Sequence, residues 1–154
     1  MKLFLYHFEI RGLFNMRIIN REIGYAIKAL CFMIKEKDKV VTTGHLANCI
    51  KISRPFLRKI LQQLNIAGIL NSYKGKGGGF QLAMEPDQII LIDLVKIFQG
   101  PVQVCSCYNK GQECPLIKDC PVRHEIENLE KKFISELSKI SLRGFVGEAD
   151  KIYY

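Results

Sequence analysis

The chain has 154 residues, of which 48% are hydrophobic and 25% charged. This composition excludes global disorder and predicts one domain, or a small domain with an oligomerisation element. The net charge is +8 and is unevenly distributed, because residues 16–80 carry +9 and residues 81–154 carry −2. A basic segment joined to a nearly neutral one indicates that the basic part faces a polyanion such as nucleic acid. No apolar run approaches the ~20 residues of a membrane span and no secretory signal is recognisable, so we expect a cytoplasmic protein without membrane contact.

Three amphipathic helices are predicted in the basic segment. The first is capped by Asn20 and has apolar residues at the spacing of one helix face. The second begins at Thr42 or Thr43, and the third is capped by Ser53. Gly68 lies where a left-handed residue ends the third helix.

A β-hairpin is predicted after the third helix. Residues 69–73 and 80–83 have the composition of strands, and the Gly/Lys-rich residues 74–79 between them suit a hairpin tip. Three helices followed by a hairpin predict a winged helix-turn-helix; the alternative is a basic, solvated helical hairpin with a flexible loop. Arg, Lys and Gln on the third helix suit base edges in the major groove, and the lysines of the tip suit phosphates. The residues expected to contact double-stranded DNA are Ser53, Arg54, Phe56, Arg58, Lys59, Gln62 and Gln63 from the helix, and Lys74 and Lys76 from the wing.

The six cysteines fall into two groups. Cys31 and Cys49 are isolated in apolar helical surroundings and are expected to be small core side chains. The other four crowd into sixteen residues of a loop and are Cys105, Cys107, Cys114 and Cys120. Clustered thiols in a cytoplasmic chain indicate zinc or an iron–sulfur cluster, and spacings looser than the CxxC of structural zinc sites favour a cluster. Because no CxxC is present, a thiol-redox enzyme is disfavoured and no enzymatic activity is expected.

A long amphipathic helix is predicted over residues 121–140, directly after Cys120. Its apolar stripe extends over five turns, more than a small domain can cover. We therefore expect the surplus to pack against the same helix of a second subunit in a homodimer; folding back on its own domain is the alternative. The positive end of the helix favours an anionic thiolate at Cys120, and His124, one turn further, could reach the same centre. The stripe consists of Val122, Ile126, Leu129, Phe133, Leu137 and Ile140.

Four segments follow from these patterns. Residues 1–15 are interpreted as an N-terminal extension, or as an upstream misread start with Met16 as the first residue. Residues 16–84 are expected to form the winged helix-turn-helix, and residues 85–120 a connecting helix and the cysteine loop. Residues 121–154 are expected to form the dimerisation helix and a tail. The expected fold is thus mainly α with a small β-hairpin wing.

With these motifs the chain resembles the Rrf2 family of bacterial transcription regulators, of the IscR, NsrR and RirA type. The resemblance implies a homodimeric winged-helix regulator, interpreted as a repressor, whose [2Fe-2S] or [4Fe-4S] cluster senses a signal and alters DNA binding. A zinc-stabilised winged-helix protein without a sensing role is the alternative. Arg58 occupies a position where some members have Glu, and Lys74 matches a wing position where relatives often carry Arg. The resemblance rests on MRIIN at 16–20, ISRPFLRKI at 52–60, KGKGGGFQL at 74–82, DxIxLxDLV at 87–95 and the late cysteine loop.

The same resemblance assigns three cluster ligands, Cys107, Cys114 and Cys120. Members that use a histidine as the fourth ligand place it three residues after the last cysteine, whereas His124 is four residues after it. Members that use an acid take it from the first helix, where Glu22 is the nearest acid here. Cys105 is extra and is a fourth ligand, a redox partner or a spectator. The order of preference for the fourth ligand is Cys105, then His124, then Glu22 of a second subunit.

Overall fold

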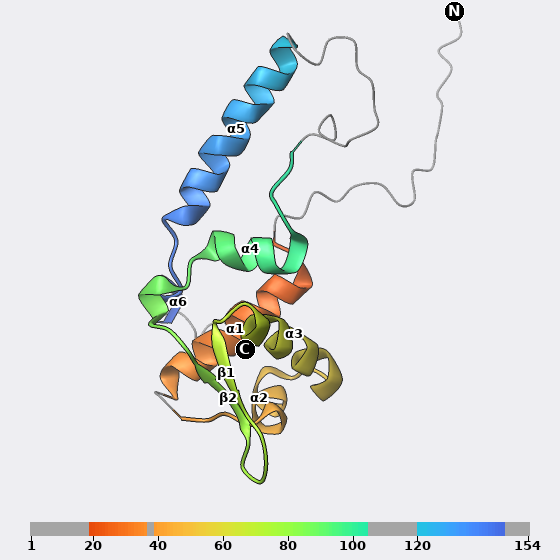
Figure 1. Cartoon of the computed structure of the whole chain (residues 1–154), viewed down its shortest axis with the longest axis vertical. Coiled ribbons are helices and arrows are strands. Elements are labelled where there is room, and N and C mark those ends of the chain that lie inside the picture. The colour runs from red at the N-terminus through yellow and green to blue at the C-terminus, as the bar shows by residue number, and fades with distance from the viewer. Residues whose placement is uncertain (1–18, 37–38, 105–119, 147–154) are drawn as a thin grey trace, which may run out of the picture.

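The computed structural model describes residues 19–36, 39–104 and 120–146. Within these ranges the chain is mainly helical with one two-stranded antiparallel sheet (Figure 1), which confirms the predicted fold class. Helices lie on both sides of the hairpin in the sequence. The elements are α1 (Arg21–Lys35), α2 (Thr43–Ile50), α3 (Arg54–Ile66), β1 (Leu70–Tyr73), β2 (Gly79–Leu82), the 3-10 turn η1 (Pro86–Gln88), α4 (Leu91–Gln99), α5 (Pro121–Ser138) and α6 (Arg143–Val146).

Helices α1 and α2 begin at side-chain caps. The Asn20 Oδ1 accepts a hydrogen bond from the backbone N–H of Ile23 at 2.8 Å, and the Thr42 Oγ1 accepts one from His45 at 3.2 Å. Each cap satisfies an N–H that has no partner inside the helix, which stabilises a helix by about 1 kcal/mol. Helix α2 ends at Lys51, whose left-handed backbone (φ 54°, ψ 49°) makes the tight turn toward α3.

The two ends of helix α3 are stabilised in different ways. Ser53 stands at the N-cap position but makes no side-chain cap hydrogen bond, so the predicted cap is wrong in that respect. Pro55 occupies the second helical position and has no N–H, which removes one of the two donors that a cap accepts. At the other end Gly68 has φ 78° as predicted, and the N–H of Ile69 donates to the carbonyl of Leu64 at 2.9 Å. This pattern is the usual glycine-dependent helix end.

The wing is tied to the segment that precedes α2. Strands β1 and β2 pair with Leu70 opposite Leu82, and Val41 forms a further bridge with Phe80. Val41 and Phe80 exchange two backbone hydrogen bonds, at 2.8 and 2.9 Å. A Cβ atom on Gly79 would collide with the carbonyl oxygen of Val41, so glycine is required for this close approach.

The hydrophobic core lies among α1, α2, α3 and α4 and includes the base of the wing. Cys31 is fully buried there, which confirms its expected role as a core side chain. Burial raises the pKa of the Cys31 thiol, and the nearby Lys35 lowers it in part. The largest fully buried side chains are Ile23, Leu30, Leu46, Leu57, Ile60, Leu61, Leu64, Leu70, Ile89, Leu94 and Leu142.

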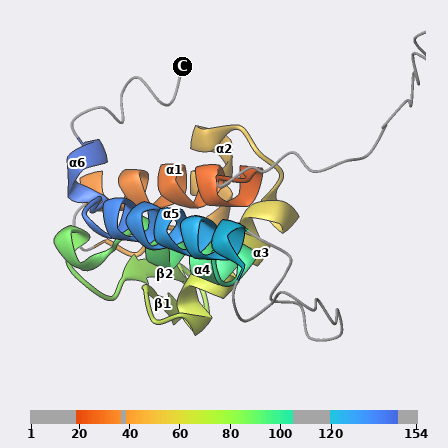
Figure 2. The same cartoon turned by 90° about the horizontal axis from the view of Figure 1, so that it is seen from above.

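Helix α5 contributes to this core only near its C-terminal end. Leu137 is buried, whereas Val122 is 65% and Leu129 59% exposed, so much of the predicted apolar stripe is uncovered in the single chain. Figure 1 shows α5 rising from the body, and it lies across α4 when seen from above (Figure 2). Within the described ranges, no helix combines the length and the apolar character that crossing a membrane requires.

The segment after α5 is fixed to the body. The N–H of Leu91 donates to the carbonyl of Ile140, and the N–H of Leu142 donates to that of Ile89, both at 2.9 Å. Leu142 is fully buried, and α6 packs on α1. Helix α5 is therefore anchored at its C-terminal end, while its start, next to Cys120, lies far from that anchor (Figure 1).

Candidate nucleic-acid interface and metal centre

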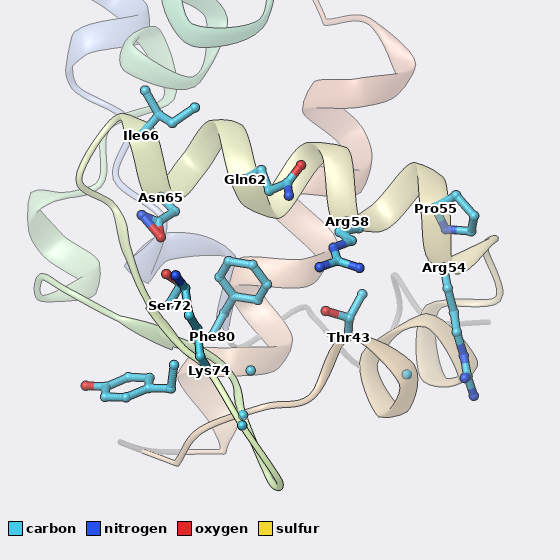
Figure 3. A pocket seen from close by; sticks show the side chains of 15 residues that line it. Thr43, Arg54, Pro55, Arg58, Gln62, Asn65, Ile66, Ser72, Lys74 and Phe80 are labelled. Atoms are coloured by element: carbon cyan, nitrogen blue, oxygen red, sulfur yellow. The ribbon is translucent and has the colours of Figure 1, made fainter.

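An open groove of about 980 Å³ separates α3 from the wing. Helix α3 forms one wall, β1 and the wing tip form the other, and the start of α2 lies beside them (Figure 3). Three cationic side chains line the groove, those of Arg54, Arg58 and Lys74, and none of the residues that line it is acidic. Basic walls open to solvent suit a long polyanion better than a small molecule, which would need an enclosed apolar cavity.

One face of α3 points into the groove. Arg58, Gln62 and Asn65 are spaced four and three residues apart, which places them on one side of a helix. Figure 3 shows Arg58 and Asn65 directed toward the wing and Gln62 between them along α3, and Ser72 of β1 and Lys74, the residue after β1, lie on the opposite wall. Arg suits guanine edges, and Gln and Asn suit adenine. The structure thus brings together Arg58, Gln62 and Lys74 from the predicted set, and it adds Asn65 and Ser72, of which Asn65 was recognisable from its helical spacing.

Arg54 lies across the first turn of α2. A Cβ atom added to Gly44 would stand 3.2 Å from the Arg54 Cζ, so the absence of a side chain at Gly44 leaves room for the guanidinium. Thr43 and Gly44 are the first two residues of α2, and N–H groups at a helix start attract anions. The guanidinium and the helix start together form a place that suits a DNA phosphate. The sequence did not reveal Thr43 and Gly44, because their closeness to Arg54 arises only when α2 and α3 fold together.

Three predicted DNA contacts lie on another face of α3, toward α1. Phe56 stacks edge-to-face on Tyr25 with ring centroids 5.7 Å apart. The Lys59 Nζ lies 3.3 Å from the Glu22 Oε1, in an ion pair between α3 and α1. The Gln63 Oε1 is buried and has no hydrogen-bond partner among the described residues. Polar residue type alone could not separate this face from the groove face.

The two remaining predicted contacts lie at the ends of the interface. Ser53 is exposed at the start of α3 and lines a separate pocket of about 560 Å³ beside the start of α1. Lys76 is exposed in the wing tip, beyond the residues that line the groove. The tip is closed by a hydrogen bond from the N–H of Gly78 to the carbonyl of Gly75 at 3.0 Å. Lys76 is thus placed for a contact outside the groove.

The described residues on either side of the cysteine loop, Val104 and Cys120, both meet α5. Cys120 is the N-cap residue of α5 and is half-buried, and the carbonyl of Cys120 accepts a hydrogen bond from the N–H of His124 at 3.2 Å. At the other end of the loop, the N–H of Val104 donates to the Glu130 Oε2 at 3.1 Å. The three other loop cysteines, Cys105, Cys107 and Cys114, lie outside the described residues.

Cys120 and His124, the described donors beside the loop, suit a soft metal centre but are too few to hold one without further ligands. Within the described ranges no three His, Cys, Asp or Glu residues gather closely enough to hold a metal ion. The Cys120 side chain makes no cap hydrogen bond, so its sulfur is not committed to the α5 backbone. Thiolate sulfur suits zinc and iron–sulfur clusters, and a helix start favours its negative charge. Cys120, with His124 exposed one turn away, would therefore supply one or two ligands to a centre completed by the loop.

The groove, the basic α3 face and the wing define a winged helix-turn-helix DNA-binding protein. The chain belongs to the Rrf2 family, whose model, described as an iron-dependent transcriptional regulator, matches residues 19–148. The transcriptional regulator NsrR of Bacillus subtilis is 23% identical over 130 residues, covering 83% of this chain and 89% of that protein. Among solved structures, CymR, the global cysteine regulator of B. subtilis, has a TM-score of 0.64 at 21% identity and covers 84% of this chain and 96% of that one. IscR of T. potens has a TM-score of 0.63 at 21% identity and covers 93% of both chains.

Membership of this family confirms the resemblance found in the sequence. The family and these relatives are transcription regulators, so the chain is a member of a family of DNA-binding regulators. The similarity of the three-dimensional structures extends over most of the chain, and the family model, which matches residues 19–148, spans the winged helix and the long helix α5.

Proposed function

We propose that this protein is an iron–sulfur cluster-dependent transcription regulator that binds operator DNA as a homodimer and represses transcription, with the state of the cluster setting its DNA affinity. The observation that carries the proposal is that the residues on either side of the cysteine loop both meet α5, through Cys120 and through the bond from Val104 to Glu130. A loop held in this way can transmit a change in its metal centre to a helix that is fixed to the winged helix at its other end. The family match, whose description names iron dependence, supports the same function.

The proposed cluster ligands are Cys107, Cys114 and Cys120, with Cys105, His124 or Glu22 as the fourth. When bound, the cluster would supply a centre that reacts with oxidants or nitric oxide and that is not assembled when iron is limiting. His124 is exposed and one turn from Cys120, so its side chain is free to turn toward the loop. The ion pair between Glu22 and Lys59 gives that carboxylate another role, which supports its last place in the order of preference.

The homodimer is proposed to form through α5. Val122 and Leu129 are exposed on the part of the helix that rises from the body. Covering an apolar side chain of this size contributes roughly 1.5–3 kcal/mol, and a symmetric interface uses each residue twice. A second α5 is the simplest surface that would cover this stripe.

The ligand assignment is tested by anaerobic reconstitution with iron and sulfide, followed by measurement of iron, sulfide and visible absorption per chain. The wild-type chain is expected to become coloured and to hold a cluster, and Cys120→Ser is expected to lose it because a hydroxyl is a poor iron ligand. Cys49→Ser, outside the loop, is the matched control and should retain the cluster. Full cluster content in Cys120→Ser would overturn the assignment.

A zinc-stabilised winged-helix regulator is the second candidate, because the sulfur of Cys120 and the imidazole of His124 also suit zinc. Zinc has no redox chemistry and gives a colourless protein. Stoichiometric zinc without visible absorption, after purification and reconstitution without oxygen, would favour this candidate over the cluster.

A further inference from the structure

Helix α2 carries a thiol–imidazole pair that the proposed function does not use. Cys49 is half-buried rather than part of the core, contrary to the expectation from its apolar surroundings. Its Sγ lies 3.8 Å from the Nε2 of His45, one helical turn earlier on the same face. The His45 ring packs edge-on against Phe32 of α1, with centroids 5.6 Å apart, which orients the ring that faces Cys49.

We propose that His45 and Cys49 form a two-ligand site for zinc. A tetrahedral zinc ion holds sulfur at about 2.3 Å and imidazole nitrogen at about 2.05 Å, which places the two donors about 3.6 Å apart. The observed 3.8 Å needs a shift of only about 0.2 Å, well within side-chain freedom. Zinc binding by two side chains at i and i+4 of one helix is the geometry of the HExxH motif, here with a thiolate as the second donor.

Two further features of α2 support a cation at this pair. Cys49 lies in the last turn of the helix, where carbonyl groups without partners favour positive charge. His45 is exposed, so water can complete the coordination. Within the described ranges no third protein ligand joins the pair, so the proposed site is open to solvent. Binding takes one proton from the Cys49 thiol into solvent and engages the neutral imidazole.

The position of the pair links zinc to the DNA interface. Helix α2 begins at Thr43 and Gly44, which line the groove, and the pair joins its first and last turns. A metal bridge across one turn would oppose fraying of this eight-residue helix, whose length alone makes it marginal. Zinc would therefore stiffen the helix that supports Arg54.

The test uses the full chain and site-resolved alkylation, because the loop cysteines can also bind zinc. Iodoacetamide is applied with and without zinc chloride, and the Cys49 peptide is quantified by mass spectrometry. Alkylation requires the free thiolate, so zinc at about ten times its Kd should slow the reaction at Cys49 about tenfold. His45→Ala should abolish this protection, whereas Asn48→Ala, an exposed neighbour on α2, should keep it.

Two results would overturn the proposal. One is an unchanged alkylation rate at Cys49 when zinc is added to the wild-type chain. The other is full protection in His45→Ala, which would assign the effect to ligands elsewhere. The outcome is independent of the cluster proposal, because loss of the cluster changes the loop peptides and not the peptide that contains Cys49.

Discussion

Arg58 and Lys59 are adjacent cations on α3, and replacing each by alanine separates groove contacts from net charge. Arg58 is exposed and lines the groove, while the Lys59 side chain is paired with Glu22 at 3.3 Å on the face toward α1. Both substitutions remove one positive charge from the same helix. An effect of net charge alone would therefore be equal for the two variants.

The expected magnitudes differ because the two side chains meet DNA differently. A bidentate contact from Arg58 to a guanine contributes roughly 1–3 kcal/mol, so Arg58→Ala should raise Kd by about 5- to 150-fold and relax the base preference. Lys59 acts on DNA only through solvent, where charge is screened over about 8 Å, so Lys59→Ala should change binding by less than about 0.5 kcal/mol. Loss of its exposed ion pair with Glu22 should cost at most about 1 kcal/mol of folding stability.

The assay is fluorescence anisotropy at one fixed salt concentration, with a duplex selected from a random-sequence library by the wild-type protein. Thermal unfolding of both variants establishes that they are folded. Equal losses for Arg58→Ala and Lys59→Ala would refute the division of α3 into a groove face and an α1 face. So would a larger loss for Lys59→Ala.

Three further predictions concern the backbone, the assembly and the core. Gly24→Ala, in open space within α1, should stabilise the fold by about 0.5–1 kcal/mol. Gly79→Ala should destabilise it by more than about 2 kcal/mol, because the new Cβ collides with backbone. Urea unfolding measures both values, and equal effects would contradict the geometry. Leu129→Asp should yield folded monomers in light scattering, since Leu129 is exposed in the single chain. Asn128→Asp is the control and should remain dimeric. A dimeric Leu129→Asp would exclude this use of α5. The raised pKa of Cys31 means that stability is full below its ordinary value of 9.0 and falls as pH rises above it. Unfolding free energy from about pH 8 to about pH 10 should therefore fall more steeply in wild type than in Cys31→Ala, and parallel curves would remove the thiol as the cause.

Local patterns were sufficient to predict the order of the three helices, the hairpin, the connecting helix and α5, but not η1 or α6. Apolar spacing located the helices, and the caps at Asn20 and Thr42 formed as expected because a cap depends on a few neighbouring residues. The left-handed Gly68 ended α3 for the same local reason. The side-chain cap expected at Ser53 did not form, although Phe56 offers an N–H at the same position that bonds to Asn20 in α1 and to Thr42 in α2.

Features that depend on packing between elements were not predictable. Lys59 and Gln63 have the same character as Arg58 and Gln62 but lie one position later, about 100° further round α3. That this second face meets α1, through the Lys59–Glu22 ion pair, follows only from how the helices pack. The contact between Gly44 and Arg54 joins α2 to α3. Such contacts arise from how the helices pack, and no spacing along one helix encodes them.

The burial of each isolated cysteine also could not be predicted from the local sequence pattern. Cys31 and Cys49 have similar apolar neighbours, yet one is fully buried and the other faces His45 on the surface. The difference follows from which side of α1 and of α2 meets the core. Exposure of a cysteine therefore had to come from the packed structure.

Control of DNA binding by a cluster on the loop is tested by one comparison. The Kd for the selected duplex is measured without oxygen for the reconstituted protein and for the same protein after removal of iron by a chelator. Coupling between two sites commonly amounts to 1–3 kcal/mol, so a change in Kd of about 5- to 150-fold is expected. Equal affinity of the two forms, within about twofold, would contradict cluster control and leave a DNA-binding protein that senses nothing through its cysteines.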